Sequence, residues 1–452
     1  MTGAAISSSC DHVASRLIFG PGPKCSHGPQ IFSHCSFRVE YKCSFPYSLI
    51  SPPLELVARM SKMEPPPIPP IIRIQILPHP RLSIADFLRF PLPNQLPDSN
   101  FQNFASFWSS EAPNVVWDDF QSDALPDLPI PSTSMISSLL DLYPQHASSS
   151  SILYTHIGDL HGQSDARYPL WILTYWMEVS RLQQHVKRLW LKAKSFLAKA
   201  QNDWAHPETR QLANSAQLAL IQLPWAGEAH GFPDPEPVVL FAHYLSEGWL
   251  RTTHINQQLD LLQCDLVLGG HLHIEVVNPR FFTKLLELYN TRSHVPYVNK
   301  SGSRNIWAIG EALAQGVRLK VGGVANINAN HWVGIVIDQA QSTILYGDSL
   351  STTQLPSNSN ILDALGWWVN QHTKSHFTFK PLAITVQMDD YNCGILSVNA
   401  VQNALLPGKE NGLLPSSIAA INRQRIAIFK RTVNHDLGCV SVGFHQISSI
   451  LY

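Results

Sequence analysis

The longest uninterrupted pattern of apolar positions lies between Leu170 and about Trp204, where the chain has no proline or glycine. Apolar residues recur there at steps of three and four, which places them on one face of a helix. A second helical pattern, from about Glu208 to Leu223, ends before Pro224. We therefore predict an unusually long amphipathic helix and a second helix that pairs with it as a hairpin. The apolar positions of the long helix are Ile172, Trp176, Val179, Leu182, Val186, Leu189, Ala193, Phe196 and Ala200.

The second half of this predicted long helix is basic. Our main interpretation is a helix that packs on its apolar stripe and leaves a solvated basic face. The alternative is a docking helix for an acidic partner or, as the less favoured choice, nucleic acid. The basic residues are Lys187, Arg188, Lys192, Lys194 and Lys199.

The chain before residue 166 shows no sustained period. Residues 1–50 are rich in Ser, Cys and His, and residues 99–150 are polar and mostly predicted as loop. Residues 51–98 are proline-dense, and proline removes amide donors and fixes φ, so we expect polyproline II and no helix there. The exception is one or two helical turns at Leu82–Leu88. We predict a largely disordered segment with a linker, and a docking site for a proline-binding module as the alternative.

The chain after the breaker-rich stretch from Gly231 to Pro237 carries a different pattern, and this stretch makes a good domain boundary. Apolar, β-branched runs predict strands at residues 331–338, 341–346 and 377–384. Helical patterns lie at residues 249–262, 281–289, 306–314, 361–372, 393–406 and 423–433.

Composition narrows the class of protein. The 452 residues allow two or three domains, and only 14% of them are charged. A net charge of −1 gives no overall field that would recruit nucleic acid or a membrane. The seven cysteines are odd in number and irregularly spaced, which indicates a reducing compartment, the nucleus or cytoplasm. We find no secretory signal and no apolar run of roughly 18 residues.

Two groups of residues invite a metal interpretation, and we favour neither. Four cysteines lie in the first 50 residues, at positions 10, 25, 35 and 43, but none forms a tight pair with another. Zinc sites usually contain two cysteines separated by two to four residues. His271 and His273 could offer two imidazoles, yet no carboxylate or cysteine is suitably spaced. We therefore expect no metal site.

Candidate catalytic chemistry lies in the last third of the chain. His331 opens a predicted strand, and Asp348 follows the end of the next one, 17 residues later. An antiparallel hairpin of this length would bring the two side chains together. Cys393 opens a predicted helix, whose N-terminus and a neighbouring imidazolium both favour a thiolate.

These side chains match the parts of a thiol protease. Cys393 would attack a carbonyl carbon, His331 would take the thiol proton and later protonate the leaving amine, and Asp348 would orient the imidazole. The side-chain amide of Gln387 and the backbone amide of Cys393 could face the developing oxyanion. Each residue alone is weak evidence, but the ordered set predicts a cysteine protease.

The chain here resembles the ubiquitin-like-protein-specific cysteine proteases, which include the SUMO (sentrin) proteases. The resemblance covers about residues 240–437 and includes Trp249-Leu250 at the start of a helix. It rests on His331-Trp332, Asp348-Ser349-Leu350, and Gln387 with Tyr391-Asn392-Cys393-Gly394, in the order His, Asp, Gln, Cys.

This resemblance implies an α/β (α+β) fold of the papain-like class, with a mixed central sheet flanked by helices. It implies hydrolysis of the peptide or isopeptide bond after the Gly-Gly terminus of a SUMO-like modifier, with that modifier and its conjugates as partners and no metal or cofactor. Trp249 and Trp332 would flank the tunnel for the Gly-Gly tail, because glycines lack side chains and two indoles can close over them.

The expected organisation has four parts. They are a disordered region at residues 1–165, a helical region of unassigned role at 166–230, the catalytic domain at 237–437 and a tail at 438–452.

Three departures from the family pattern leave the modifier open. Asn392 stands where the family usually has aspartate, Met388–Asp390 replaces a run with glycine or asparagine, and Thr252 replaces an acidic residue. They motivate one alternative, a catalytically weak or inactive module that binds a modifier and could be of transposon origin. A third hypothesis is acyl transfer by the same thiol.

Overall fold

The computed structural model describes residues 64–97, 104–114, 129–153, 166–292, 297, 302–351, 355–356, 359–406 and 412–450. The chain divides into two compact units, Met1–Ser48 and Leu49–Tyr452, and every described residue belongs to the second. The predictions made for residues 1–63, including the four cysteines considered for zinc, lie outside the described residues.

A mixed sheet forms the centre of the C-terminal half. Among the described residues its five strands lie in the order β10-β9-β8-β7-β6. The central strands β7, β8 and β9 pair antiparallel, and the outer strands β6 and β10 pair parallel to their neighbours. The strands are β6 (Ile274–Val277), β7 (Lys320–Ile327), β8 (His331–Asp338), β9 (Thr343–Gly347) and β10 (Thr378–Pro381). The strands predicted at 331–338 and 341–346 are confirmed, and the one at 377–384 is shorter.

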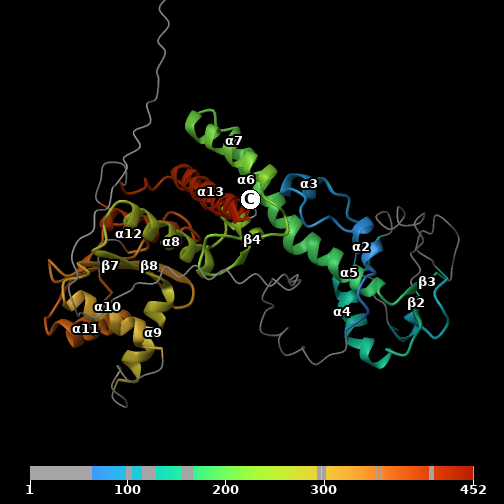
Figure 1. Cartoon of the computed structure of the whole chain (residues 1–452), viewed down its shortest axis with the longest axis horizontal. Coiled ribbons are helices and arrows are strands. Elements are labelled where there is room, and N and C mark those ends of the chain that lie inside the picture. The colour runs from blue at the N-terminus through green and yellow to red at the C-terminus, as the bar shows by residue number, and fades with distance from the viewer. Residues whose placement is uncertain are drawn as a thin grey trace, which may run out of the picture. The chain divides into compact units, whose positions relative to one another are not determined.

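Helices cover both faces of this sheet (Figure 1). Because successive side chains of a strand point to opposite faces, Trp332 and Val336 of β8 enter one apolar core, whereas Val333 and Ile335 enter the other. The first core contains α8 (Thr252–Leu268), α12 (Cys393–Leu405) and α13 (Ile418–Ile450). The second contains α9 (Pro279–Asn290), α10 (Arg304–Ala314) and α11 (Asn360–Thr373). The fold is therefore mixed α/β, as predicted.

The helix at the end of the chain is longer than predicted. We expected a closing helix over residues 423–433 followed by a tail, but α13 runs from Ile418 to Ile450. No proline lies in this stretch, so nothing in the backbone requires the helix to end early.

The long helix of the N-terminal half is confirmed. It consists of α5 (Ile172–Arg181), a π-helical turn η4 (Leu182–Lys187) and α6 (Arg188–Gln201). Its apolar stripe is buried, with Trp176 and Trp190 at 1% and 0% exposure. The second predicted helix is α7 (Pro207–Gln222), which packs against α6 as a hairpin.

Two predictions for the N-terminal half are wrong. The proline-dense stretch contains α2 (Pro70–Ile76), because Pro70 occupies the first turn, where a helix needs no amide donor. The stretch predicted as loop contains α4 (Thr133–Leu142), whose first turn is capped by the Ser132 hydroxyl and which buries Met135 and Leu139. The short helix expected near residues 82–88 is confirmed as α3 (Ile84–Arg89).

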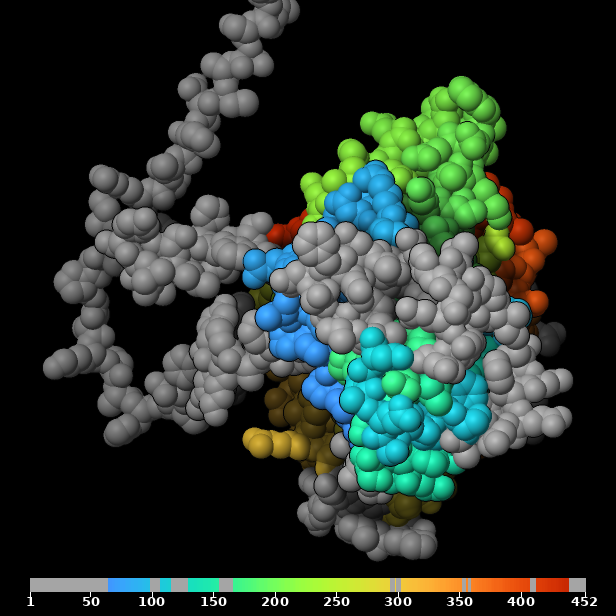
Figure 2. Space-filling view, turned by 90° about the vertical axis from the view of Figure 1, so that its right-hand side faces the viewer, coloured from blue at the N-terminus to red at the C-terminus, as the bar shows by residue number. Residues whose placement is uncertain are grey.

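Short elements complete the described N-terminal half. Its face in Figure 2 shows the blue segment of residues 64–97 against the green helices, in agreement with the packing of α3 on α6 and α7. The short elements are η1 (Phe104–Phe107), β1 (Trp108–Ser109), η3 (Tyr143–Gln145), β2 (Ser151–Leu153), β3 (Arg167–Pro169), β4 (Glu228–Ala229), β5 (Glu236–Pro237) and η5 (Val238–His243).

One apolar core extends from the N-terminal helices into the C-terminal half. It includes buried residues from Ile68 to Val433. Helix α7 packs on α13, and α6 packs on η5. The division into a helical region and a catalytic domain near residue 230 stays a prediction.

Candidate active site

The hairpin of β8 and β9 brings His331 and Asp348 together. His331 is the first residue of β8, and Asp348 directly follows the last residue of β9. Because Gly334 pairs with Gly347 in this antiparallel register, the start of one strand lies beside the end of the other. The imidazole Nε2 lies 2.8 Å from the Asp348 Oδ1. Both side chains are mostly buried, at 12% and 17% exposure.

Cys393 approaches the same imidazole from α12. It is the first residue of that helix and is 2% exposed. Since Nε2 of His331 faces Asp348, Nδ1 is the ring nitrogen left for the hydrogen bond with Cys393. The imidazole of His331 therefore interacts with both Asp348 and Cys393.

This arrangement favours a protonated His331. Burial alone lowers the pKa of the imidazole, but the hydrogen bonds and electrostatic interactions with Asp348 and Cys393 outweigh it and raise the pKa to about 9. For Asp348 burial acts in the opposite direction and raises the pKa. Hydrogen bonds from His331 and from the Leu350 and Ser351 amides outweigh burial, so the pKa of Asp348 lies below its ordinary value. At neutral pH the site therefore holds an imidazolium beside a carboxylate.

The first turn of α12 packs closely against β8, which fixes where Cys393 lies. The Ser397 hydroxyl donates to the Trp332 carbonyl at 2.9 Å. A Cβ atom added to Gly394 would lie 2.9 Å from Ile255 Cδ1 and 3.3 Å from Trp332 Cδ1. A side chain at this position would have to displace the end of the Ile255 side chain on α8, so glycine allows the close packing seen here.

Gln387 is held next to the site by its hydrogen bonds. Its backbone amide donates to the Ser349 carbonyl at 2.9 Å, and its side-chain oxygen accepts from the Ser349 hydroxyl at 2.9 Å. The side-chain nitrogen donates to the Asp389 carbonyl at 2.6 Å. One N–H of the Gln387 side-chain amide is thus bonded within its own loop. The contact of Gln387 with an oxyanion stays a prediction.

A buried polar network before Cys393 was missed by sequence reasoning. Asp389 accepts from the backbone amides of Tyr391 and Asn392, and its Oδ2 accepts from the Asn392 side chain at 2.6 Å. The Asn392 Oδ1 in turn accepts from Arg425 Nε at 2.7 Å. Arg425 also donates at 2.7 Å to the carbonyls of both Ser246 and Gly248.

The Arg425 guanidinium therefore joins the loop before Cys393 to the segment that carries Trp249. Arg425 is 0% exposed, and burial is the main reason that its pKa falls to about 10. The sequence carries no clear signal for this role, because Arg423 and Arg425 both lie between the apolar residues Ile421 and Ile426 of α13 and only Arg425 is buried.

The two tryptophans predicted to flank a tunnel differ in exposure. Trp249 is 44% exposed, whereas Trp332 is 2% exposed and donates its indole N–H to the Leu250 carbonyl at 3.0 Å. The segments that carry them are thus in contact. A role of either indole in binding a substrate stays a prediction.

Exposed apolar side chains lie next to the site residues in the sequence, and sequence reasoning missed them too. Leu350, two residues after Asp348, is 65% exposed. Val386 and Met388, on either side of Gln387, are 47% and 64% exposed. Since Gln387 bonds to Ser349, these two segments run together. They could supply an apolar contact for a bound polypeptide.

Within the part of the chain that the structure describes, no group of three or more His, Cys, Asp or Glu residues is placed to hold a metal ion. The rings of His271 and His273 have centroids 6.1 Å apart. The helices described there include none long and apolar enough to span a bilayer.

Comparison with known proteins gave matches among solved structures alone. No protein-family model matches the chain, and no curated protein does. The chain is similar to the C-terminal Ulp1 protease domain in complex with Smt3, the yeast ortholog of SUMO, at 21% identity and a TM-score of 0.38, over 50% of this chain and 95% of that one.

Two further structures show a comparable level of similarity. The catalytic domain of the Ulp1-like SUMO protease of Chaetomium thermophilum is 14% identical, with a TM-score of 0.36 over 54% of this chain and 89% of that one. The Xanthomonas campestris effector XopD bound to ubiquitin is 18% identical, with a TM-score of 0.27 over 40% and 90%.

Proposed function

We propose that the C-terminal half, residues 237–437, is a cysteine peptidase that hydrolyses the peptide or isopeptide bond after the Gly-Gly terminus of a SUMO-like modifier. The observation that carries this proposal is that His331 interacts with Asp348, at 2.8 Å, and with Cys393. A thiol alone is a weak nucleophile at neutral pH, and a neighbouring imidazolium favours its thiolate form.

The reaction follows from these positions. The Cys393 sulfur attacks the carbonyl carbon of the terminal glycine, and the C–N bond breaks as His331 gives its proton to the leaving amine. A thioester remains. His331 then takes a proton from water, the resulting hydroxide attacks the thioester carbonyl, and the carboxylate leaves as Cys393 is restored.

The oxyanion formed in each step needs donors. The backbone amide of Cys393 is among the first amides of α12, which have no partner within a helix. The second N–H of the Gln387 amide could join it, since the first is bonded to Asp389. Asp348 keeps the imidazole oriented with Nδ1 toward the sulfur.

Substrate selection would depend on the residues around Trp249. A Gly-Gly tail is the narrowest that a polypeptide can have, so a slot closed by the Trp249 and Trp332 side chains would reject bulkier ends. The exposed Leu350, Val386 and Met388 could contact the apolar surface of the modifier that precedes this tail.

The test is a panel of ubiquitin-like proteins with C-terminal extensions, incubated with the full chain. We expect release of the extension from a SUMO-like member, and a fall of at least about a thousandfold in kcat/KM in Cys393→Ala. Cys264→Ala is the matched control, because Cys264 is exposed and lies outside the site. Unchanged cleavage by Cys393→Ala would rule out the proposed nucleophile.

One observation favours the alternative of a module that binds a modifier without cleaving it. Cys393 is 2% exposed, so little of this residue is open to a substrate. A modifier that ends in a vinyl sulfone separates the two proposals. Covalent capture at Cys393 supports the peptidase, whereas reversible binding without capture supports the module.

A further inference from the structure

A basic stripe on the long helix lies outside the proposed active site. Between residues 179 and 202 the chain has six Lys or Arg residues and no Asp or Glu, although the whole chain has 32 basic and 33 acidic residues. The local charge is therefore opposite in sign to the net charge of −1. Such a concentration of one sign attracts anions to this part of the surface.

Helix geometry aligns three of these cations. Trp190, Ala193 and Leu197 are buried and fix which side of α6 faces the core. Positions 188, 192 and 199 then fall on one exposed side, within about 40° of one another, and extend over about 16 Å. We call Arg188, Lys192 and Lys199 the basic stripe. Lys199 lies 3.8 Å from Glu247, but both side chains are mostly exposed, so this pair is weak.

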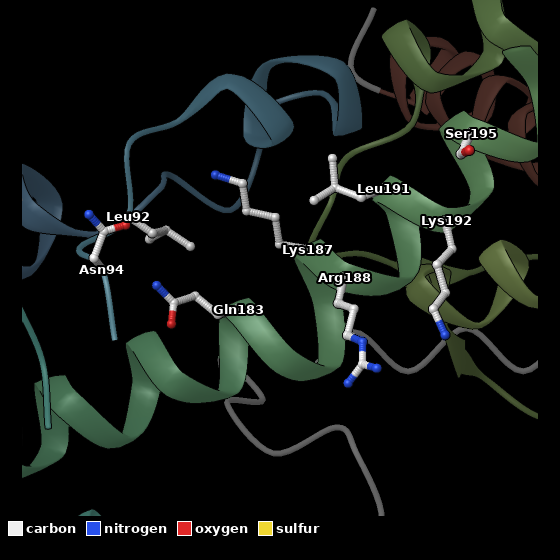
Figure 3. A pocket seen from close by; sticks show the side chains of 8 residues that line it. All are labelled: Leu92, Asn94, Gln183, Lys187, Arg188, Leu191, Lys192 and Ser195. Carbon is white, nitrogen blue, oxygen red and sulfur yellow. The ribbon is translucent and has the colours of Figure 1, made fainter. Parts of the chain in front are cut away.

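The stripe borders a groove between the helix and the segment of residues 92–94. The groove has a volume of about 540 Å³ and its lining contains no carboxylate. Figure 3 shows Lys187 extending toward the opposite segment, while Arg188 and Lys192 extend in a common direction from the helix. The lining residues are Leu92, Asn94, Gln183, Lys187, Arg188, Leu191, Lys192 and Ser195.

The far wall of the groove is tied to the helix. Lys187 Nζ donates to the Phe90 carbonyl at 2.8 Å, and the Gln183 amide donates to the Pro93 carbonyl. Both residues lie in the π-helical turn η4, a kind of irregularity that is frequent at functional sites. The groove is thus a built feature of the fold, with its two walls joined by hydrogen bonds, and differs from a plain solvated helix face.

An exposed aromatic residue follows the last cation of the stripe by five positions in the sequence. Trp204 is 78% exposed in the turn between α6 and α7, and the Arg210 guanidinium lies 4.6 Å from its ring centroid. Groups that bind single-stranded nucleic acid combine a basic track for phosphates with aromatic rings on which bases stack. An acidic polypeptide would use the cations but would gain nothing from an indole.

We propose that this groove and the basic stripe bind the sugar–phosphate backbone of a single-stranded nucleic acid, with a base stacked on Trp204. The Asn94 amide and the Ser195 hydroxyl are further donors of the kind that contact phosphate oxygens. The three cations of the stripe can each neutralise one phosphate of the strand. Recognition through the backbone would be independent of sequence and shared by DNA and RNA.

The test measures binding of fluorescein-labelled 20-nucleotide oligo-dT and oligo-U to the full chain by anisotropy, between 50 and 200 mM salt. The variant Arg188→Gln/Lys192→Gln/Lys199→Gln removes the stripe. Each lost contact should lower the slope of log K against log salt by about 0.7, so we expect about a hundredfold weaker binding at 0.1 M salt. Trp204→Ala should weaken binding about fivefold or more, and Trp204→Phe should largely keep it.

The matched control is Arg280→Gln/Arg304→Gln/Lys380→Gln, which removes three exposed cations away from the groove. It changes the net charge from −1 to −4, as the stripe variant does. Equal weakening by both triple variants would show that total charge alone matters. That result, no binding of either oligonucleotide at 50 mM salt, or binding of polyglutamate in place of the oligonucleotides, would each overturn the proposal.

Discussion

The charge on His331 depends on two neighbours that arrive from different elements. Its pKa of about 9 lies above its ordinary value of 6.5, because the contacts with Asp348 and Cys393 outweigh burial. A group whose pKa is raised by folding stabilises the folded state fully below its unfolded pKa. The stabilisation, about 3 kcal/mol at most, is therefore present below pH 6.5 and is lost as the pH rises through 9.

This balance can be tested by removing one neighbour. In Asp348→Asn the carboxylate charge is gone, so we expect the pKa of His331 to fall toward 6.5 or lower, and kcat/KM to fall roughly a hundredfold or more. Titration of the His331 ring by NMR measures the first effect, and cleavage assays measure the second. An unchanged titration midpoint in this variant would contradict the assigned role of Asp348.

Arg425 is the second residue with a large expected effect. Its guanidinium is fully buried and has no carboxylate partner; it is satisfied by Asn392 Oδ1 and by the Ser246 and Gly248 carbonyls. Arg425→Met would leave these acceptors buried and unpaired, which we expect to lower the free energy of unfolding by about 3 kcal/mol or more. Urea unfolding measures this change.

Arg423→Met is the matched control on the same helix. Arg423 and its partner Glu208 are 38% and 56% exposed, so losing that pair should cost under about 1 kcal/mol. Arg425→Lys keeps the charge but cannot make the forked contacts, so it should lie between wild type and Arg425→Met. A free energy of unfolding in Arg425→Met equal to that of Arg423→Met would show that the network is dispensable.

At the scale of elements, the strands and helices that carry the site could be predicted from their sequence. Strand β8 has an apolar, β-branched run, and the sequence of α12 from Ile395 to Leu405 has no proline or glycine. The central strand β7 was missed because it contains Gly322 and Gly323, which usually weaken a strand. A Cβ atom at Gly323 would lie 2.4 Å from the Val277 carbonyl oxygen, so the neighbouring strand requires glycine.

The helices α2 and α4 were missed for a related reason. Their prolines and serines count as breakers within a helix but favour its first turn, where Pro70 and Ser132 lie. The hydrogen bond between Asn392 and Arg425 could not be predicted from the sequence. The two residues are 33 positions apart, and nothing in the local pattern marks Arg425 as buried. Side-chain partners across such distances are decided by packing, which periodicity does not report.

At the scale of the whole molecule, the two halves of the described chain share one apolar core. Helix α7 packs along α13, the helix that carries Arg425, and Asp436 of α13 accepts from the His230 amide. Arg423 of α13 pairs with Glu208 of α7. The N-terminal helices therefore support the element that holds the loop before Cys393.

This packing predicts that the proposed catalytic domain is weakened when it is isolated. A fragment of residues 237–452 loses α6 and α7, which pack on η5 and α13, two elements whose buried apolar side chains include Phe241 and Ile421. Each exposed large apolar side chain costs about 1.5–3 kcal/mol. We expect a clearly lower Tm, and a lower urea concentration at the midpoint of unfolding, than for residues 64–452. That longer fragment keeps every described contact. Equal Tm values would show that the shared core contributes nothing and that the catalytic domain folds on its own.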